Sequence, residues 1–349
     1  MTTTRALIAK TPGAKFSKEN IERRPVGPND VRIEVAFSGV CHSDIHQVRN
    51  EWFDGIFPMV PGHEIAGHIV EVGSNVTKFK VGDRAGIGTF VDSCNECEPC
   101  KAGQENYCLK GNVQTYNGRE YDGTPTLGGY SREIVAKADY VLHIPEGIDL
   151  AESAPLLCAG ITVYSPLAHW GAGPGKRAAI LGMGGLGHIA VKMAAAMGAE
   201  VYVLGHSTSK RDEALSYGAT DYRSINDPKT FEDLGGKLDF IVNATSANID
   251  VNQLLSLLKV DGSLVFVGLP PEKQSFGAFS IVPQRRSISG SNTGGIQETQ
   301  EMLDFCAKHG IGSTIELVDA SNEADVDTAW DRVVASDVRY RFVIDASTI

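Results

Sequence analysis

The sequence contains no run of about 18 consecutive apolar residues, the length that a membrane-spanning helix needs. Its N-terminus is too polar to act as a secretory signal. Basic clusters are also absent, because 43 Asp and Glu outnumber 32 Lys and Arg and give a net charge of −11. A phosphate backbone would repel such a chain. We therefore predict a cytoplasmic protein with no membrane and no nucleic acid among its partners.

Aromatic residues make up only 7% of the chain, and cysteines number only seven. An odd number of cysteines without an export signal argues against a disulfide framework and favours metal binding. Hydrophobic residues reach 42%, which is enough for packed cores, and 349 residues correspond to about two domains.

The secondary-structure pattern changes along the chain. As far as about residue 150, short apolar stretches such as 31–37 and 65–72 lie between Gly, Pro, Asn and Asp turns, which predicts a β-rich region. Beyond it, strands are expected at 177–181, 201–204, 239–243 and 264–268, and helices at 186–197, 210–216 and 251–258. This alternation indicates a parallel sheet. A helix at 297–309 and a polar, mixed tail complete the prediction.

Four cysteines follow the spacing C-x2-C-x2-C-x7-C: Cys94, Cys97, Cys100 and Cys108. Four thiolates at short spacing can close a tetrahedral shell around zinc and leave no open position. An iron–sulfur cluster also uses four thiolates, but the last gap does not fit the common ferredoxin spacing. A zinc knuckle on nucleic acid would need basic flanks, and these flanks are acidic. Free buried thiols are the remaining alternative, and we predict a structural zinc site.

A second group of metal-binding residue types is spread over the first half of the chain: Cys41, His63 and Cys158. Two cysteines and a histidine supply three ligands and leave a fourth position for water or substrate, as a catalytic zinc does. Spacing alone does not establish this site, since each residue could equally lie in a core.

The residues around His63 read Gly62-His63-Glu64-x-x-Gly67-x5-Gly73-x-x-Val76, which resembles the signature of zinc-dependent medium-chain alcohol dehydrogenases. The four-cysteine spacing is similar to theirs. The stretch Cys158–Leu167 resembles the cinnamyl alcohol dehydrogenase branch, and 128–131 and 294–303 resemble its bacterial broad-specificity aldehyde reductases. The resemblance extends from about Gly27 to Asp345.

This resemblance implies roles for individual side chains. It implies zinc ligation by Cys41, His63 and Cys158, with Glu64 as a carboxylate near the metal and Asp44 as the carboxylate that orients the histidine.

The resemblance also implies a proton path. Ser43 would touch the substrate oxygen and His46 would pass the proton to solvent. Alcohol oxidation does require a small hydroxyl and a group that titrates near neutrality. The alternative reading is a turn hydroxyl and a surface histidine.

A glycine-rich motif lies between the strand at 177–181 and the following helix: Gly182, Gly184, Gly185, Leu186 and Gly187. It matches G-x-G-x-x-G, in the strand–turn–helix context that a dinucleotide pyrophosphate requires. A glycine run that only packs a helix is the alternative. The resemblance adds Thr162 to the expected cofactor contacts.

The stretch after the second strand decides which nicotinamide cofactor we expect. NAD-preferring enzymes carry an acidic residue there for the ribose hydroxyls. This chain instead has Ser207, Lys210 and Arg211, which suit the additional 2′-phosphate of NADP(H). The alternative is a serine-capped helix start with a solvated Lys–Arg pair. We predict NADP(H).

The aromatic residues Trp52, Phe53 and Phe57 lie between two proposed zinc ligands. They could line an apolar pocket for aromatic or medium-chain aldehydes, or belong to the core. Cys306 is expected to be a small buried hydrophobe on a helix.

These observations predict an α/β protein with a β-rich, GroES-like zinc-binding catalytic domain at 1–154 and 294–349, and a Rossmann NADP-binding domain at 155–293. The expected activity is interconversion of primary alcohols and aldehydes by hydride transfer, with two zinc ions per chain. A zinc-free quinone reductase would lack both metal-ligand sets, and a zinc-storage or redox-sensing protein would not need Ser43 and His46. Family analogy predicts a homodimer joined through a β-rich segment at 276–291.

Overall fold

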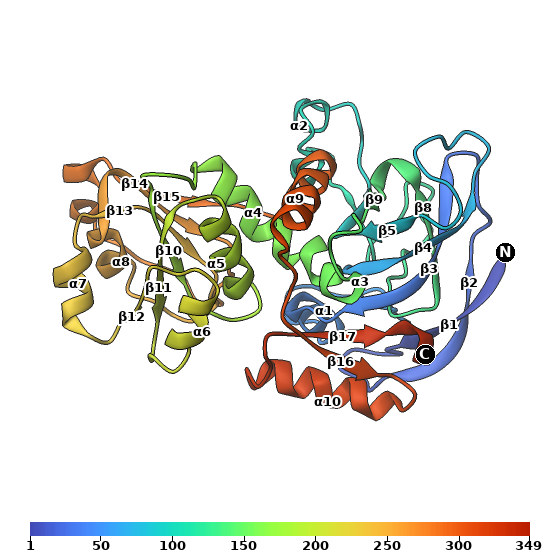
Figure 1. Ribbon diagram of the computed structural model, residues 1–349. Coiled ribbons are helices and arrows are strands. Elements are labelled where there is room, and N and C mark those ends of the chain that lie inside the picture. The colour runs from blue at the N-terminus through green and yellow to red at the C-terminus, as the bar shows by residue number, and fades with distance from the viewer. The chain divides into compact units, whose positions relative to one another are not determined.

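Segments from both ends of the chain build the first of two units in the computed structural model, which describes all residues from Met1 to Ile349 (Figure 1). Unit 1 contains Met1–Cys158 and Gly294–Ile349, and unit 2 contains Ala159–Thr293. No helix in either unit combines the length and the apolar character that crossing a membrane requires.

Unit 2 is built on a parallel six-stranded sheet with the order β12-β11-β10-β13-β14-β15. Its strands are β10 (Arg177–Leu181), β11 (Glu200–Gly205), β12 (Asp221–Ser224), β13 (Leu238–Asn243), β14 (Leu258–Phe266) and β15 (Ser287–Gly290). Its helices are α4 (Ala159–His169), α5 (Gly187–Ala196), α6 (Arg211–Ser216), α7 (Pro228–Leu234) and α8 (Val251–Ser256). Ile180, Val203 and Val242 are fully buried, as expected for a parallel sheet covered on both faces. The strand order reverses between β10 and β13, and doubly wound sheets bind ligands at the carboxyl ends of the strands beside such a point.

Two predictions for unit 2 are wrong in detail. The strand expected at 264–268 is the second half of β14, which starts at Leu258 and passes through Asp261 with a φ of +64°. The segment 276–291 is mostly not β, because it forms the 3-10 turns η4 (Ala278–Ser280) and η5 (Val282–Gln284) before β15. A proline inside η5 has no N–H to offer a neighbouring strand.

Unit 1 contains a seven-stranded sheet whose central strand is β3 (Asp30–Gly39). The other strands are β4 (Ile65–Val72), β5 (Arg84–Ile87), β8 (Glu133–Lys137), β9 (Leu142–His143), β16 (Ile315–Asp319) and β17 (Arg341–Asp345). β3 pairs antiparallel with β4, β8 and β17. Alternate residues of β3, namely Val31, Ile33 and Val35, are at most 1% exposed and form part of the core.

Shorter elements complete unit 1. Two further strand pairs join β1 (Thr2–Ile8) to β2 (Ser17–Arg23) and β6 (Phe90–Asp92) to β7 (Val113–Gln114). The short helices of its first segment are α1 (His42–Val48), α2 (Glu98–Lys101), η1 (Glu105–Tyr107), η2 (Ala138–Tyr140), α3 (Leu150–Ser153) and η3 (Ala154–Leu157).

The C-terminal segment is not the polar tail that the sequence predicts. After α9 (Ile296–His309), it forms β16, α10 (Glu323–Val334), β17 and the 3-10 turn η6 (Ala346–Thr348). Val343 of β17 lies opposite Gly39 of β3, so the end of the chain is part of the main sheet (Figure 1). Cys306 lies on α9 and is fully buried, as expected.

Candidate metal centres and nucleotide-binding turn

The backbone around β3 and β4 brings three separate segments to one buried place. Cys41 follows the end of β3 and precedes α1, His63 and Glu64 directly precede β4, and Cys158 follows η3. The ligand atoms of Cys41, His63, Glu64 and Cys158 all lie within 4.8 Å of one another, and all four residues are buried.

The geometry of this group fits a single metal ion. Cys41 Sγ and Cys158 Sγ are 4.0 Å apart, and His63 Nε2 is 3.2 Å from Cys158 Sγ. Two sulfurs bound tetrahedrally to one zinc would lie about 3.8 Å apart, because a Zn–S bond measures about 2.3 Å. Two thiols and an imidazole also match the donors that zinc prefers. The residues present therefore fit a zinc ion with three protein ligands.

Asp44 fixes the orientation of the histidine. Its fully buried carboxylate lies 3.1 Å from His63 Nδ1 and accepts hydrogen bonds from the backbone N–H groups of Cys41 (2.9 Å) and Gly62 (3.2 Å). Tyr130 donates a further bond of 3.4 Å to the same carboxylate. With Nδ1 held by Asp44, Nε2 faces the two sulfurs, which is the usual arrangement for a metal-ligating histidine.

The proximity of these groups shifts their pKa values. The hydrogen bond with Cys158 holds the pKa of Cys41 well below its ordinary value, and the same contact raises the pKa of Cys158. Burial alone would lower the pKa of His63, but the charge and hydrogen bond of Asp44 raise it well above its ordinary value.

Glu64 is fully buried beside the cluster. Burial raises its pKa to about 8, although the ion pair with Arg341 of β17 opposes this shift. Its Oε2 atom has no hydrogen-bond partner. Gly39 makes room for this carboxylate, because a Cβ at that position would lie 2.0 Å from Glu64 Oε2.

The two residues of the expected proton path lie at different distances from the cluster. Ser43 Oγ is 3.6 Å from Cys41 Sγ. His46 lies one helical turn further along α1, where its ring stacks between His42 (5.7 Å) and Trp52 (4.7 Å) and its Nδ1 pairs with Glu51. Its side chain is 31% exposed, so it has access to water.

The aromatic loop after α1 is divided between surface and core. Trp52 and Phe53 are 42% and 56% exposed, whereas Phe57 packs against the main hydrophobic core of unit 1. Most of the surface that a substrate could contact therefore belongs to Trp52 and Phe53, because Phe57 is partly buried.

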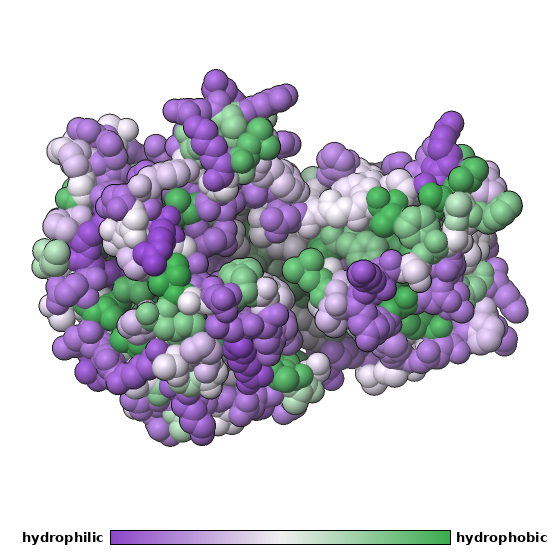
Figure 2. Space-filling view, turned by 180° about the vertical axis from the view of Figure 1, so that it is seen from behind, coloured by the Kyte–Doolittle hydropathy of each residue, from purple (hydrophilic) through white to green (hydrophobic).

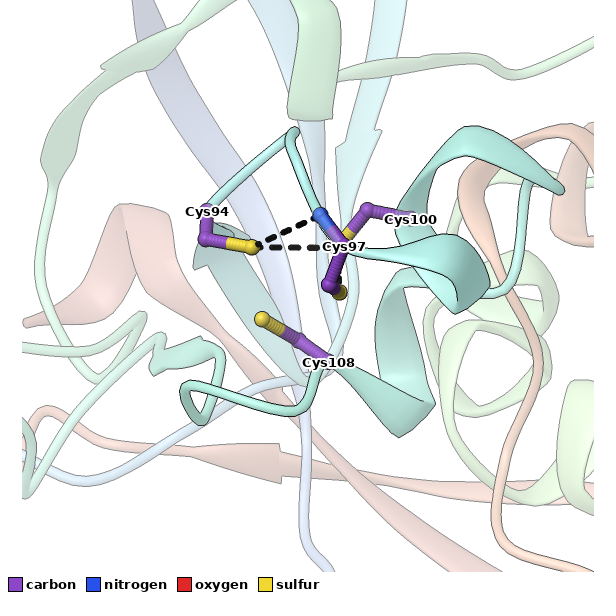
Figure 3. Close-up of side chains that lie close together, drawn as sticks. All are labelled: Cys94, Cys97, Cys100 and Cys108. Atoms are coloured by element: carbon purple, nitrogen blue, oxygen red, sulfur yellow. Dashed lines mark hydrogen bonds between the residues drawn. The ribbon is translucent and has the colours of Figure 1, made fainter.

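The four clustered cysteines converge in a lobe formed by the loop after β6 together with α2 and η1. Figure 3 shows their sulfur atoms pointing toward a common centre. Cys100 Sγ lies 3.3 Å from Cys97 Sγ and 3.9 Å from Cys94 Sγ, and all four sulfurs lie within 4.8 Å of one another. Backbone N–H groups, of Cys100 first, lower the pKa of Cys97 to about 6. Four converging thiols of this kind fit a closed tetrahedral zinc site.

The glycine-rich turn of unit 2 joins β10 to α5. Gly182 has a φ of +89°, a conformation that favours glycine, and a Cβ on Gly187 would lie 1.8 Å from the carbonyl oxygen of Gly182. A Cβ on Gly184 would meet nothing within 4 Å, so the turn is open on that side. Gly185 and Leu186 complete the turn before α5 begins, and the N-terminus of such a helix is a favourable place for a pyrophosphate.

Of the three residues expected to bind the 2′-phosphate after β11, Lys210 contacts the glycine-rich turn and Arg211 is paired elsewhere. Lys210 Nζ donates to the carbonyl oxygen of Met183 in the glycine-rich turn at 2.8 Å, and Ser207 Oγ lies on the surface 3.0 Å from Ser209 Oγ. Arg211 instead pairs with Asp221 of β12 at 2.7 Å. Thr162 is buried on α4.

Sequence reasoning missed several side chains that support the first cluster. Arg341 sits buried beside Glu64, and the ring of Tyr116 stacks on His63 with centroids 5.7 Å apart. Trp330 of α10 donates to Tyr130, which donates to Asp44. Only Arg341 left a sequence signal, as a cation at the head of the apolar stretch Arg-Phe-Val-Ile.

Two family models match the chain. Residues 27–146 match an alcohol dehydrogenase GroES-like domain, and residues 185–308 match a zinc-binding dehydrogenase. Cys41, His63 and the four clustered cysteines all lie inside the first matched segment.

Individual proteins match over nearly the whole length. A probable formaldehyde dehydrogenase of Bacillus subtilis is 56% identical over 99% of this chain and 98% of its own. The NADP-dependent alcohol dehydrogenase C of Mycobacterium tuberculosis is 52% identical over 100% of both chains. Among solved structures, a cinnamyl alcohol dehydrogenase from Sorghum bicolor superposes with a TM-score of 0.94 at 42% identity, covering 99% of this chain and 98% of its own. A cinnamyl alcohol dehydrogenase from Helicobacter pylori in complex with NADP(H) gives a TM-score of 0.91 at 42% identity, covering 99% of each chain.

Proposed function

The chain belongs to the zinc-type alcohol dehydrogenase family, and we propose that it is a broad-specificity aldehyde reductase that acts on aromatic and medium-chain aldehydes with NADP(H). The observation that carries this proposal is the buried group of Cys41, His63 and Cys158, whose three donor atoms would leave a fourth position on a zinc ion for substrate. Unit 1 would be the catalytic domain, with sequence-based boundaries at 1–154 and 294–349. Unit 2 would be the Rossmann cofactor domain, expected at 155–293.

Cys41, His63 and Cys158 would hold the catalytic zinc, which supplies a Lewis acid that polarises the carbonyl oxygen of the substrate. The reduced nicotinamide supplies the hydride. Asp44 keeps His63 in the tautomer that presents Nε2 to the cluster. The buried carboxylate of Glu64, with its unpartnered Oε2, would lie beside the metal.

Reduction of an aldehyde consumes one proton for each hydride, and the residues of α1 would deliver it. Ser43 Oγ lies close to the cluster and would donate to the substrate oxygen. His46 is partly exposed and is held by Glu51, so it would replace that proton from water. Ser43 contacts Cys41 and His46 contacts Glu51, with no direct hydrogen bond between the two side chains, so a bridging group such as a water molecule would have to connect them.

NADP(H) is favoured by the end of β11. No carboxylate lies between Val203 and Arg211, where an NAD-binding enzyme carries one. Ser207 and Lys210 would contact the 2′-phosphate, and Arg211 would join them by exchanging its contact with Asp221 for one with the phosphate. The pyrophosphate would lie on the glycine-rich turn: Gly182, Gly184, Gly185, Leu186 and Gly187. Thr162 would contact the nicotinamide half.

The second zinc would be structural, held by Cys94, Cys97, Cys100 and Cys108. Such a site has no open position, and it would stabilise a lobe whose only helices are a four-residue and a three-residue turn. Because both sites require reduced thiols, we place the protein in the cytoplasm.

The most exposed apolar surface of unit 2 lies beside the edge strand β15. Phe276, Phe279 and Val282 are 47%, 93% and 72% exposed. Figure 2 shows that hydrophobic residues also reach the surface on the face of the molecule turned to the viewer. The outer side of the edge strand β15 is free, and an edge of this kind in a segment with exposed aromatic side chains is suited to pairing with a second copy of the chain. We propose a homodimer formed through this edge.

A kinetic comparison tests the proposed activity. The zinc-containing protein is assayed with benzaldehyde, cinnamaldehyde and medium-chain aliphatic aldehydes, each with NADPH and with NADH. The proposal predicts turnover of several aldehydes and a higher kcat/KM with NADPH. Absence of turnover across this panel would favour a zinc-storage or sensing role, and a preference for NADH would contradict the cofactor assignment.

A further inference from the structure

Cys100 differs from Cys94 and Cys97 in the burial and in the hydrogen-bond partners of its sulfur atom. It is buried, whereas Cys94 and Cys97 are partly exposed. The sulfurs of those two accept backbone N–H bonds, from Cys97 to Cys94 Sγ at 3.4 Å and from Leu109 to Cys97 Sγ at 3.5 Å. Cys100 also has a backbone hydrogen bond, from Asn95, and its Sγ in addition lies 3.3 Å from a side-chain hydroxyl, Ser93 Oγ.

That hydroxyl is the first member of a buried polar chain. Ser93 Oγ is 2.8 Å from the hydroxyl of Tyr140, and Tyr140 in turn donates to Asn95 Oδ1 at 2.9 Å. Ser93 is 2% and Tyr140 3% exposed, so their mutual contact is shielded from water, whereas Asn95 at the end of the chain is exposed. Asn95 closes the loop by donating from Nδ2 to the carbonyl oxygen of Ser93 at 3.1 Å.

The two hydroxyl groups can hydrogen-bond to the Cys100 sulfur both when it is a thiol and when it is a thiolate. Each hydroxyl carries one proton and can also accept. When Cys100 is a thiol, its S–H donates to Ser93, Ser93 donates to Tyr140, and Tyr140 donates to Asn95. When Cys100 is a thiolate, Ser93 turns its proton to the sulfur and Tyr140 donates to Ser93. Rotation of the Ser93 and Tyr140 hydroxyl groups is therefore enough to change Ser93 from an acceptor to a donor of the hydrogen bond with Cys100.

We propose that Ser93 and Tyr140 are positioning residues of the structural metal site: Ser93 would donate to the metal-bound Cys100 thiolate, Tyr140 would donate to Ser93, and together they would slow release of the ion. A hydrogen bond to a thiolate is charge-assisted, and it is stronger where water is excluded. Groups that hydrogen-bond to metal ligands commonly change metal affinity by about 10- to 100-fold. The inference rests on the proposed assignment of zinc to the four cysteines.

The test measures zinc release in the full-length protein. To isolate the structural site, the rate is measured in a His63→Ala background, with zinc released to an excess of a chromogenic chelator. We expect Ser93→Ala to accelerate release by about 10- to 100-fold. Ser93→Thr, which keeps the hydroxyl, should stay close to the background rate. Tyr140→Phe should give a smaller acceleration, because Ser93 can still donate after losing its own donor.

Thr230→Val is the matched control, since Thr230 is a 1% exposed residue of unit 2 whose hydroxyl bonds only to the backbone carbonyl of Ser224. It should leave the release rate unchanged. If Ser93→Ala does not fold, Tyr140→Phe still decides the question, because the ring and its contact with Phe90 are kept.

Two results would overturn the proposal in distinguishable ways. Release from Ser93→Ala or Tyr140→Phe at the background rate would show that the hydroxyl chain does not hold the metal. A wild-type protein with one zinc per chain, and none in the His63→Ala background, would instead refute the assignment of zinc to the four cysteines.

Discussion

Glu64 and Arg341 form a buried ion pair although 277 residues separate them in the sequence. The side chains of Glu64 and Arg341 are 0% and 6% exposed. Because Arg341 opens β17, the pair attaches the last strand of the chain to the turn that carries His63. The C-terminal segment thus takes part in forming the candidate catalytic site.

Replacement of Arg341 should destabilise unit 1. Arg341→Met leaves the Glu64 carboxylate buried without its partner, and breaking a buried pair in this way costs about 3–5 kcal/mol. Urea unfolding followed by fluorescence measures the change in free energy. Arg5→Met, which removes an exposed arginine of β1, is the control and should cost under about 0.5 kcal/mol. A loss below about 1 kcal/mol for Arg341→Met would contradict the importance of the pair.

Substitution of Gly39 tests the space left for the Glu64 carboxylate. Gly39→Ala places a Cβ 2.0 Å from Glu64 Oε2, and relief of such overpacking costs about 1–3 kcal/mol. Thermal unfolding and zinc content should both fall. In Gly173→Ala, the control, the nearest atom lies 3.7 Å from the new Cβ, so neither quantity should change. Equal behaviour of the two variants would refute the close approach at Gly39.

A carboxylate at position 207 should reverse the cofactor preference. Ser207→Asp introduces the acidic group that binds ribose hydroxyls in NAD-dependent enzymes and repels a 2′-phosphate. We expect kcat/KM for NADPH to fall by at least about tenfold, or about 1.4 kcal/mol, while the value for NADH is kept or rises. Ser216→Asp adds the same charge at an exposed position of α6 and should leave the ratio unchanged. An unaltered ratio in Ser207→Asp would exclude Ser207 from the phosphate site.

The stability contributed by Asp239 should depend on pH. Burial alone would raise its pKa, but the backbone N–H of Arg177 and the ammonium group of Lys259, each 2.8 Å away, hold the pKa below its ordinary value. A carboxyl with a lowered pKa stabilises the fold above its unfolded pKa of about 3.9 and loses that contribution as pH falls through the folded value. Asp239→Asn should therefore cost about 1–3 kcal/mol at pH 7, and the difference from wild type should shrink below about pH 4.

Unfolding of wild type and Asp239→Asn over this pH range measures the effect. Asp212→Asn, which alters an exposed carboxyl of α6, should track wild type at every pH. A difference between wild type and Asp239→Asn that stays constant through the acid range would contradict the lowered pKa.

Local patterns in the sequence predict the elements that carry the cofactor turn and one zinc-ligand turn. The strands expected at 65–72 and 177–181 coincide with β4 and β10, because an apolar run with turn residues at both ends contains its own boundaries. The turn beginning at Gly182 is recognisable for the same reason, since its positive φ and close contacts demand glycine at fixed spacing.

Long-range pairing is what the sequence does not reveal. The tail after α9 looks polar because β16 has mainly half-exposed or exposed residues. Its position in the sheet is set by pairing with β17, and β17 in turn pairs with β3, which lies near the other end of the chain. The contacts of Tyr116 with His63 and of Tyr130 with Asp44 are likewise set by tertiary packing and not by local spacing. For Arg211 the sequence shows a cation near the phosphate site, whereas the structure shows its contact with Asp221.

The central claim is that the group of Cys41, His63 and Cys158 binds the zinc on which aldehyde reduction depends. The most direct measurement is NADPH oxidation with cinnamaldehyde by chelator-treated protein as Zn²⁺ is added back, with Cys158→Ala and Cys306→Ala compared in parallel. Both cysteines are buried, but only Cys158 belongs to the cluster. We predict that activity returns with zinc in wild type and Cys306→Ala and does not return in Cys158→Ala. Full activity in folded, zinc-free protein, or in Cys158→Ala, would contradict this account.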